Sequence, residues 1–135
     1  MRRQLFLLLL TFVLANCGAT PPVTLTAAAV HARWVMAVRE NDRAAALALV
    51  SADRAQREQF VDEALRAIQD LQTAPHSPTG ALRGVDVRDP TVQGAGQRGI
   101  SIWHFERKTW CYQTELIPSA DGWRVIGWGQ VAQCS

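Results

Sequence analysis

The spacing of apolar residues changes once along this chain, and that change limits the folds it can adopt. Up to Leu71 apolar residues recur every three or four positions, which is the period of an amphipathic helix. After residues 73–80, a stretch of proline, glycine and polar residues, they alternate with polar residues as in β-strands. Helices followed by a run of strands predict an α+β domain with the helices on one side of an antiparallel sheet.

Three helices are expected in the first half of the chain: Ala27–Glu40, residues 43–50, and a third that begins at Ser51 or Asp53. Thr26 and Asp42 are suited to cap the first two, because their side-chain oxygens can accept hydrogen bonds from free backbone N–H groups. The apolar positions of each helix indicate one face that packs on a core.

The second half contains the strand candidates, which are a short segment at Val85 and Val87 and then residues 100–106, 110–117 and 123–131. Residues 90–99 are rich in glycine and polar residues, so they are interpreted as a connection. Ser119-Ala120-Asp121-Gly122 is a turn sequence in which Gly122 can adopt a positive φ. The last two strands therefore form a hairpin.

A four-residue turn gives this hairpin a definite register. Pro118 lies opposite Trp123, and Tyr112 lies opposite Gly129. Ile126 and Trp128 then fall on the outer face of the sheet, away from the helices. Large apolar residues on an exposed sheet face indicate an interface, so these two are candidates for homodimer contacts. The alternative is that the C-terminal tail covers Trp128.

Three cysteines call for an explanation in an exported protein. If Cys17 is modified, Cys111 and Cys134 remain, and an oxidising compartment favours a disulfide between them. In the register above Cys111 lies opposite Gln130, and Cys134 lies roughly 13 Å further along, which is too far for a disulfide unless the tail folds back or a bulge intervenes.

The first seventeen residues have the order of a secretory signal. Arg2 and Arg3 precede an apolar run, and small residues close it just before Cys17. This arrangement resembles a bacterial lipoprotein signal, in which cleavage precedes the cysteine and its thiol carries the lipid, although Asn16 stands where Gly, Ala or Ser is usual. Residues 1–16 are therefore interpreted as the signal, residues 17–26 as a tether and residues 27–135 as the domain.

The balance of charge and the spacing of cysteine and histidine argue against nucleic-acid, metal and cofactor partners. The chain has 14 Lys and Arg against 12 Asp and Glu, and removal of Arg2 and Arg3 with the signal leaves 12 of each. Nucleic-acid binding needs an excess of basic residues, so no nucleic-acid partner is expected. The sequence has no Cys-x-x-Cys or His-x-x-x-His spacing, so neither a metal nor another cofactor is expected.

The chain resembles the nuclear transport factor 2-like superfamily. The resemblance rests on the opening helix, on its end at Glu40-Asn41-Asp42 before Ala44-Ala45-Ala46-Leu47, and on Asp121-Gly122-Trp123-Arg124-Val125. The chain is similar to small bacterial lipoproteins of that group without an assigned function. The resemblance implies a cone-shaped domain of helices packed on a curved antiparallel sheet, as in cystatin-like folds.

Some members of this superfamily are isomerases or hydrolases, and others only bind or scaffold, so the fold alone does not determine function. The resemblance implies a pocket on the concave face, for which the candidates are Trp34, Tyr112, Thr114 and His104. No carboxylate is expected among the inward positions of the last hairpin, which argues against acid–base chemistry.

The function expected from the sequence is therefore a binding or interaction module, held by a lipid on Cys17 at the outer face of the cytoplasmic membrane or at another envelope membrane. A small apolar ligand in the cone is one expectation, and pairing with a second copy is another. The alternatives are a small enzyme of the same fold, acting on an apolar molecule, and a soluble secreted domain.

Overall fold

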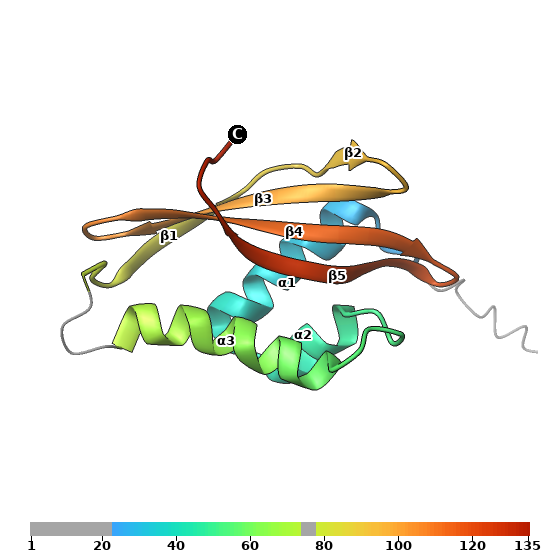
Figure 1. Ribbon diagram of the computed structural model, residues 1–135, viewed down its shortest axis with the longest axis horizontal. Helices are drawn as coiled ribbons and strands as arrows, with labels where there is room; N and C mark the ends of the chain where they lie inside the picture. The colour runs from blue at the N-terminus through green and yellow to red at the C-terminus, as the bar shows by residue number, and fades with distance from the viewer. Residues whose placement is uncertain (1–22, 74–77) are drawn as a thin grey trace, which may run out of the picture.

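The structure is a computed structural model that describes residues 23–73 and 78–135 (Figure 1). The predicted signal and the predicted lipid attachment at Cys17 lie outside the described residues. The helices come first in the chain: α1 (Ala27–Glu40), α2 (Arg43–Leu49) and α3 (Arg57–Thr73). The strands follow: β1 (Leu82–Val87), β2 (Thr91–Gln93), β3 (Gly96–Phe105), β4 (Thr109–Ser119) and β5 (Gly122–Val131).

The strands form one antiparallel sheet in the order β1-β3-β4-β5. β2 pairs with the first residues of β3, so β1 and β2 lie one after the other along the same edge of β3. Figure 1 shows the sheet as one layer and the three helices as a second layer against one of its faces. The α+β architecture predicted from the change of period is confirmed.

The first two helices begin where the sequence predicts, because both cap residues are used. Thr26 Oγ1 accepts a hydrogen bond from the Ala29 N–H at 3.2 Å, and Asp42 Oδ1 accepts one from the Ala45 N–H at 3.0 Å. Between the two helices Asn41 adopts a left-handed conformation with φ of 57°. This conformation ends α1 and turns the chain into α2.

The third helix begins later than predicted, at Arg57 and not at Ser51 or Asp53. Val50 forms a parallel bridge with Val125 of β5, and the Ser51 N–H donates to the Val125 carbonyl oxygen at 2.9 Å. These contacts fasten the α2–α3 connection to β5. The chain then turns, with the Arg54 N–H donating to the Ser51 carbonyl oxygen at 3.2 Å, and Gln56 adopts a left-handed conformation with φ of 53°. α3 begins directly after Gln56.

The prediction that residues 90–99 form only a connection is wrong. They contain β2 and the start of β3, joined by a tight turn in which Gly94 has φ of 59°. Glycine reaches that conformation at little cost, so the polar residues on either side can pair as a hairpin. The start of β3 also pairs with β4, where Gln97 lies opposite Leu116.

The last hairpin keeps the predicted register only near its turn. Pro118 lies opposite Trp123, but the register then shifts between Glu115 and Leu116, which leaves Ile126 without a partner across the ladder. Beyond this bulge Thr114 lies opposite Trp128. A shift of one residue moves every following side chain to the other face of the sheet. The predicted outer-face position of Trp128 is therefore wrong, and its ring packs toward the helices.

The C-terminal tail folds back over the outer face of the sheet, where a disulfide joins Cys111 to Cys134 with their Cα atoms 5.4 Å apart. The bulge brings Val131 opposite Cys111, and an Arg88 guanidinium N–H donates to the Cys134 carbonyl oxygen. The bulge and the returning tail thus both shorten the distance between Cys111 and Cys134 that a regular hairpin would leave. The tail lies over Ile100 and leaves less of this face open to a second copy.

A buried histidine packs between α1 and the sheet. The His31 side chain is fully buried, and its Nε2 lies 3.3 Å from the Ile100 carbonyl oxygen. Its ring lies against the backbone of Gly99, where an added Cβ would come within 2.6 Å of the ring. Burial lowers the pKa of His31 below its usual value, and the hydrogen bond to Ile100 opposes this only in part.

The lowered pKa of His31 predicts how folding stability depends on pH. Because the unfolded chain takes up a proton at higher pH than the folded protein, stability should fall as the pH drops below 6.5, the ordinary value. The fall should level off below the folded-state pKa. Urea unfolding between about pH 5 and about pH 8 tests this, since His31→Gln should flatten the profile. Identical slopes for the two proteins would assign the pH dependence to other groups.

Candidate functional site

Five aromatic side chains form a continuous row through the space between the helices and the sheet. Neighbouring rings meet by stacking or edge to face, with centroids 5.6 Å apart for Phe60–Trp34, 6.4 Å for Trp34–Trp128, 4.3 Å for Trp128–Tyr112 and 6.0 Å for Tyr112–Trp103. Such arrangements stabilise aromatic pairs beyond the area they bury. This aromatic row links α1 and α3 to the sheet through the interior.

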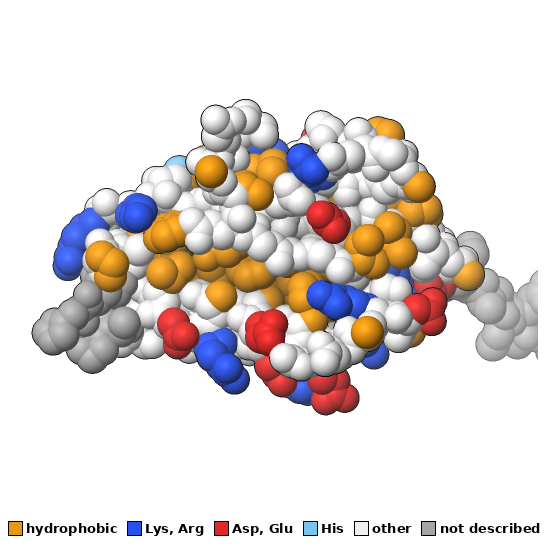
Figure 2. Space-filling view, in the orientation of Figure 1, with side chains coloured by type: hydrophobic (Ala, Val, Ile, Leu, Met, Phe, Trp, Pro, Cys, Tyr) orange, Lys and Arg blue, Asp and Glu red, His pale blue; other side chains and the backbone are white. Residues whose placement is uncertain are grey.

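The middle of the aromatic row opens into a groove between α3 and the last two strands. The groove has a volume of about 280 Å³. Its apolar lining consists of Phe60, Ala64 and Ala67 from α3, with Tyr112 and Trp128 from the sheet. α3 packs on α1 and α2 and stands away from the strands, which leaves the groove open. Figure 2 shows hydrophobic side chains in a band between the sheet and the helices below it.

Polar side chains lie at the rim of the groove. Glu63 and Gln130 are both exposed, and Glu63 accepts a hydrogen bond from Gln59 at 2.7 Å. A neighbouring hollow of about 380 Å³ shares Phe60 and Trp128 and is bordered by Arg54. The Arg54 guanidinium carbon lies 4.0 Å from the centre of the Phe60 ring, as in a cation–π contact. The groove thus has an apolar floor and a rim of mixed charge.

Several buried donors beside the groove lack a protein partner. The indole nitrogen of Trp128, which lines the groove, has no hydrogen-bond partner among the described residues, and neither has that of Trp34 nor the hydroxyl of Thr114. By contrast, the Trp103 indole N–H donates to Ser101 Oγ at 3.0 Å. A buried donor without an acceptor costs about 1–3 kcal/mol, and of these three groups only that of Trp128 belongs to a residue that lines the groove.

The structure brings together only part of the predicted pocket. Tyr112 lines the groove, and burial raises the pKa of its phenol, which therefore stays protonated near neutral pH. Trp34 and Thr114 face the interior but are fully buried. His104 was expected on the concave face and lies on the outer face, where its Nε2 is 2.8 Å from Asp86 Oδ2. The alternation of buried residues along β3 places Ser101, Trp103 and Phe105 inward instead.

The prediction also omitted residues that line the groove. Trp128 was assigned to the wrong face, and Ala64 and Ala67 carry no chemical signal in the sequence. One sequence feature did point to the correction for Trp128. The separation of Cys111 from Cys134 was too long for a regular hairpin, and a bulge was one way to shorten it.

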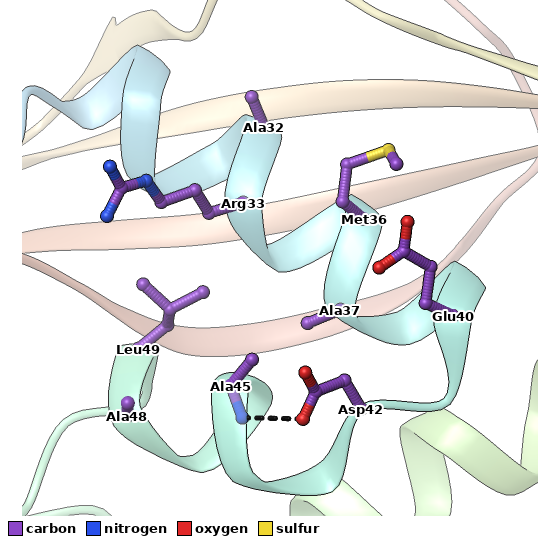
Figure 3. Close-up of a pocket in the computed structure, with 9 residues that line it drawn as sticks. All are labelled: Ala32, Arg33, Met36, Ala37, Glu40, Asp42, Ala45, Ala48 and Leu49. Carbon is purple, nitrogen blue, oxygen red and sulfur yellow. Dashed lines mark hydrogen bonds between the residues drawn. The ribbon is translucent and has the colours of Figure 1, made fainter.

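A second hollow lies on the helical layer, between α1 and α2, with a volume of about 420 Å³. Figure 3 shows a floor formed by Ala37 and Ala45, with Arg33, Met36 and Glu40 on the α1 side. The Asp42 carboxylate that borders it already caps α2, as the dashed line to the Ala45 nitrogen shows. No aromatic ring lines this hollow, so it is a weaker candidate for a ligand than the groove.

Within residues 23–73 and 78–135 no cluster of three His, Cys, Asp or Glu side chains could hold a metal ion. The same residues contain no helix that is both long and apolar enough to cross a membrane. The described residues of the groove offer a ligand aromatic surfaces, the exposed rim side chains Glu63 and Gln130, and the N–H of Trp128 and O–H of Tyr112 as donors.

Three helices against one face of a curved antiparallel sheet, with an aromatic interior between the layers, define the nuclear transport factor 2-like fold. Among solved structures, the chain is similar to a Thiobacillus denitrificans protein described as a calcium/calmodulin-dependent protein kinase type II association domain. That match has a TM-score of 0.60 and 15% identity, and covers 81% of this chain and 96% of the other. No family model and no curated protein matches the sequence. The likeness shows the fold alone.

Proposed function

We propose that this chain is an exported, lipid-anchored binding module, which holds a small apolar molecule in the groove between α3 and the sheet. The observation that carries the proposal is the wall of the groove. Tyr112 and Trp128 stack at 4.3 Å, and the Trp128 indole N–H has no hydrogen-bond partner among the residues that the structure describes. This combination suits a ring-shaped or chain-like ligand that carries one hydrogen-bond acceptor.

Binding fits this groove better than catalysis by an isomerase or hydrolase of the same fold. Acid–base catalysis needs a titratable group within hydrogen-bond reach of the reacting atom. The one carboxylate that borders the groove, Glu63, is exposed and bonded to Gln59. Behind the groove, Trp103 packs against Tyr112 and Trp34 packs against Trp128, which leaves little room for a substrate deeper in the interior.

Export and anchoring are supported by the signal-like start of the chain and by the cysteines. A disulfide between Cys111 and Cys134 is what an oxidising compartment favours, and it leaves Cys17 as the third thiol. Cys17→Ala should therefore release the protein from the membrane fraction. Fractionation of cells expressing each form tests this, and a variant that stays in the membrane would contradict anchoring through Cys17.

Ligand binding can be tested by filling the groove. Ala67 is partly buried on α3, and Ala67→Leu adds bulk where the ligand would lie. With 8-anilinonaphthalene-1-sulfonate as the probe, which combines aromatic rings and an acceptor, we expect at least about tenfold weaker binding, or about 1.4 kcal/mol. Probe fluorescence in a titration gives the Kd of each protein.

The matched control is Ala48→Leu, the same substitution in the hollow between α1 and α2. This exposed position should leave the Kd of the probe unchanged. Equal weakening in both variants would indicate a general effect on the helices. No weakening with Ala67→Leu would show that the groove is not the binding site.

A further inference from the structure

Three segments distant in the sequence meet at one end of the sheet. Residues 23–26 lie against the β4–β5 turn, where a Cβ added to Gly122 would come within 3.2 Å of Thr24. The β2–β3 turn lies beside β4, since a Cβ added to Gly96 would meet Leu116 and Ile117. Figure 1 shows both turns at the right-hand end of the molecule. We name these three segments the tip.

The tip is almost free of charge. Residues 23–32, 91–97 and 116–120 contain no Asp, Glu, Lys or Arg. Asp121, which follows these residues in the β4–β5 turn, is paired with Arg124. At the other end of the sheet, the β3–β4 turn is charged throughout, with Glu106, Arg107 and Lys108 in sequence. The two ends of one sheet thus differ sharply in polarity.

The tip also exposes apolar side chains. Val23 is 85% exposed and Val92 is 79% exposed, which makes them the most exposed large hydrophobic residues of the part of the chain that the structure describes. Trp123 borders a hollow between residues 24–26 and the turn. Tryptophan favours the boundary between water and lipid, because its ring is apolar and its N–H is polar.

The length of the chain before the tip indicates what covers it. Val23 lies six positions after Cys17, and even a fully extended chain of that length spans only about 20 Å. The ten residues of β3 extend over about 33 Å, so the charged end of the sheet lies beyond that reach. A lipid on Cys17 would therefore hold Val23, and with it the tip, within about 20 Å of the bilayer.

We propose that the tip is a lipid-contacting surface, which rests on the bilayer through Val23, Val92 and the β4–β5 turn. This inference rests on the proposed anchoring at Cys17, and it adds a defined orientation. The sheet then stands end-on to the membrane, with the groove on its side and open to water. The partner is the surface of a bilayer of mixed zwitterionic and anionic phospholipid.

The orientation can be measured by NMR on the chain purified from membranes and placed in phospholipid nanodiscs with a gadolinium-chelating headgroup lipid. We expect loss of the amide signals of Val92, Gly94 and Ala120, and retention of those of Arg107 and Lys108. Signal loss spread evenly over both ends, or confined to the β3–β4 turn, would overturn the proposal.

Two variants with the same added charge sharpen this test. Val92→Glu places a carboxylate at the tip, where contact with lipid would require its desolvation, so the Ala120 signal should return. Thr109→Glu adds the same charge at the exposed start of β4, at the other end of the sheet, and should change nothing. Equal behaviour of the two variants, or a concentration-dependent dimer through the tip in the absence of lipid, would contradict lipid contact.

Failure of the anchoring itself gives a different result. A purified chain whose Cys17 carries no lipid, by intact mass, would refute the anchor. In that case a maleimide-phospholipid coupled to Cys17 restores the attachment, because the other two thiols are joined in the disulfide. The same pattern of signal loss in the coupled protein would support the tip as a lipid-contacting surface, and its absence would refute it independently.

Discussion

Trp34→Ala is expected to lower the free energy of unfolding by about 3–5 kcal/mol, the range for removal of a large aromatic side chain from a core. Trp34 is fully buried on α1 and sits in the aromatic row between Phe60 of α3 and Trp128 of β5. Its removal leaves a cavity that separates the helical layer from the sheet. A loss of this size is a large part of the stability of a small domain, so the variant should be marginally folded at 37 °C.

Urea unfolding followed by far-UV circular dichroism measures this loss. Met36→Ala is the control on the same helix, because Met36 is 39% exposed and its truncation should cost less than about 1 kcal/mol. Similar values for the two variants would mean that Trp34 does not join the two layers as described. The Trp34 variant should also weaken probe binding, since Trp128 loses one of its two ring contacts.

Gly99→Ala is expected to destabilise the protein by about 1–3 kcal/mol, the usual cost of overpacking. The added Cβ would lie 2.6 Å from two ring atoms of His31, and the ring is enclosed between α1 and β3. The conflict can be relieved only by movement of the helix or by loss of the bond to Ile100. The melting temperature should therefore fall by several degrees.

Gly129→Ala provides the comparison in the same sheet. A Cβ added at Gly129 meets nothing within 4 Å, so the melting temperature should stay unchanged. The double variant His31→Ala with Gly99→Ala should be more stable than the sum of the single changes predicts, because the small side chain at position 31 removes the conflict. Strict additivity would show that the cost at Gly99 arises elsewhere.

Structural features that depend on residues close together in the sequence could be predicted from it. The starts of α1 and α2 depend on Thr26 and Asp42, whose side chains bond to backbone only three residues away, so both could be predicted. The turn at Gly122, with φ of 121°, is equally local. The late start of α3 could not be predicted in this way, because a left-handed Gln56 precedes it and glutamine is no sequence signal for that conformation.

The candidate site was harder to predict, for one geometric reason. A single unpaired residue at Ile126 reverses the faces of all later residues in β5. Trp128 therefore leaves the outer face and becomes a wall of the groove, while Tyr112 keeps its predicted inward position. The groove also depends on the distance between α3 and the strands, which is determined by helix packing and has no signature in the local sequence.

The central claim, an anchored module with a ligand in its groove, is tested most directly by the intact mass of the native protein. The protein is extracted in mild detergent and measured without reduction, first under native and then under denaturing conditions. Under denaturing conditions we expect the mass of residues 17–135 plus acyl groups, less the two hydrogens lost on forming the disulfide. Under native conditions we expect an additional non-covalent mass, which Ala67→Leu abolishes. A chain that begins elsewhere, or that carries Cys17 bare and binds nothing, would contradict it.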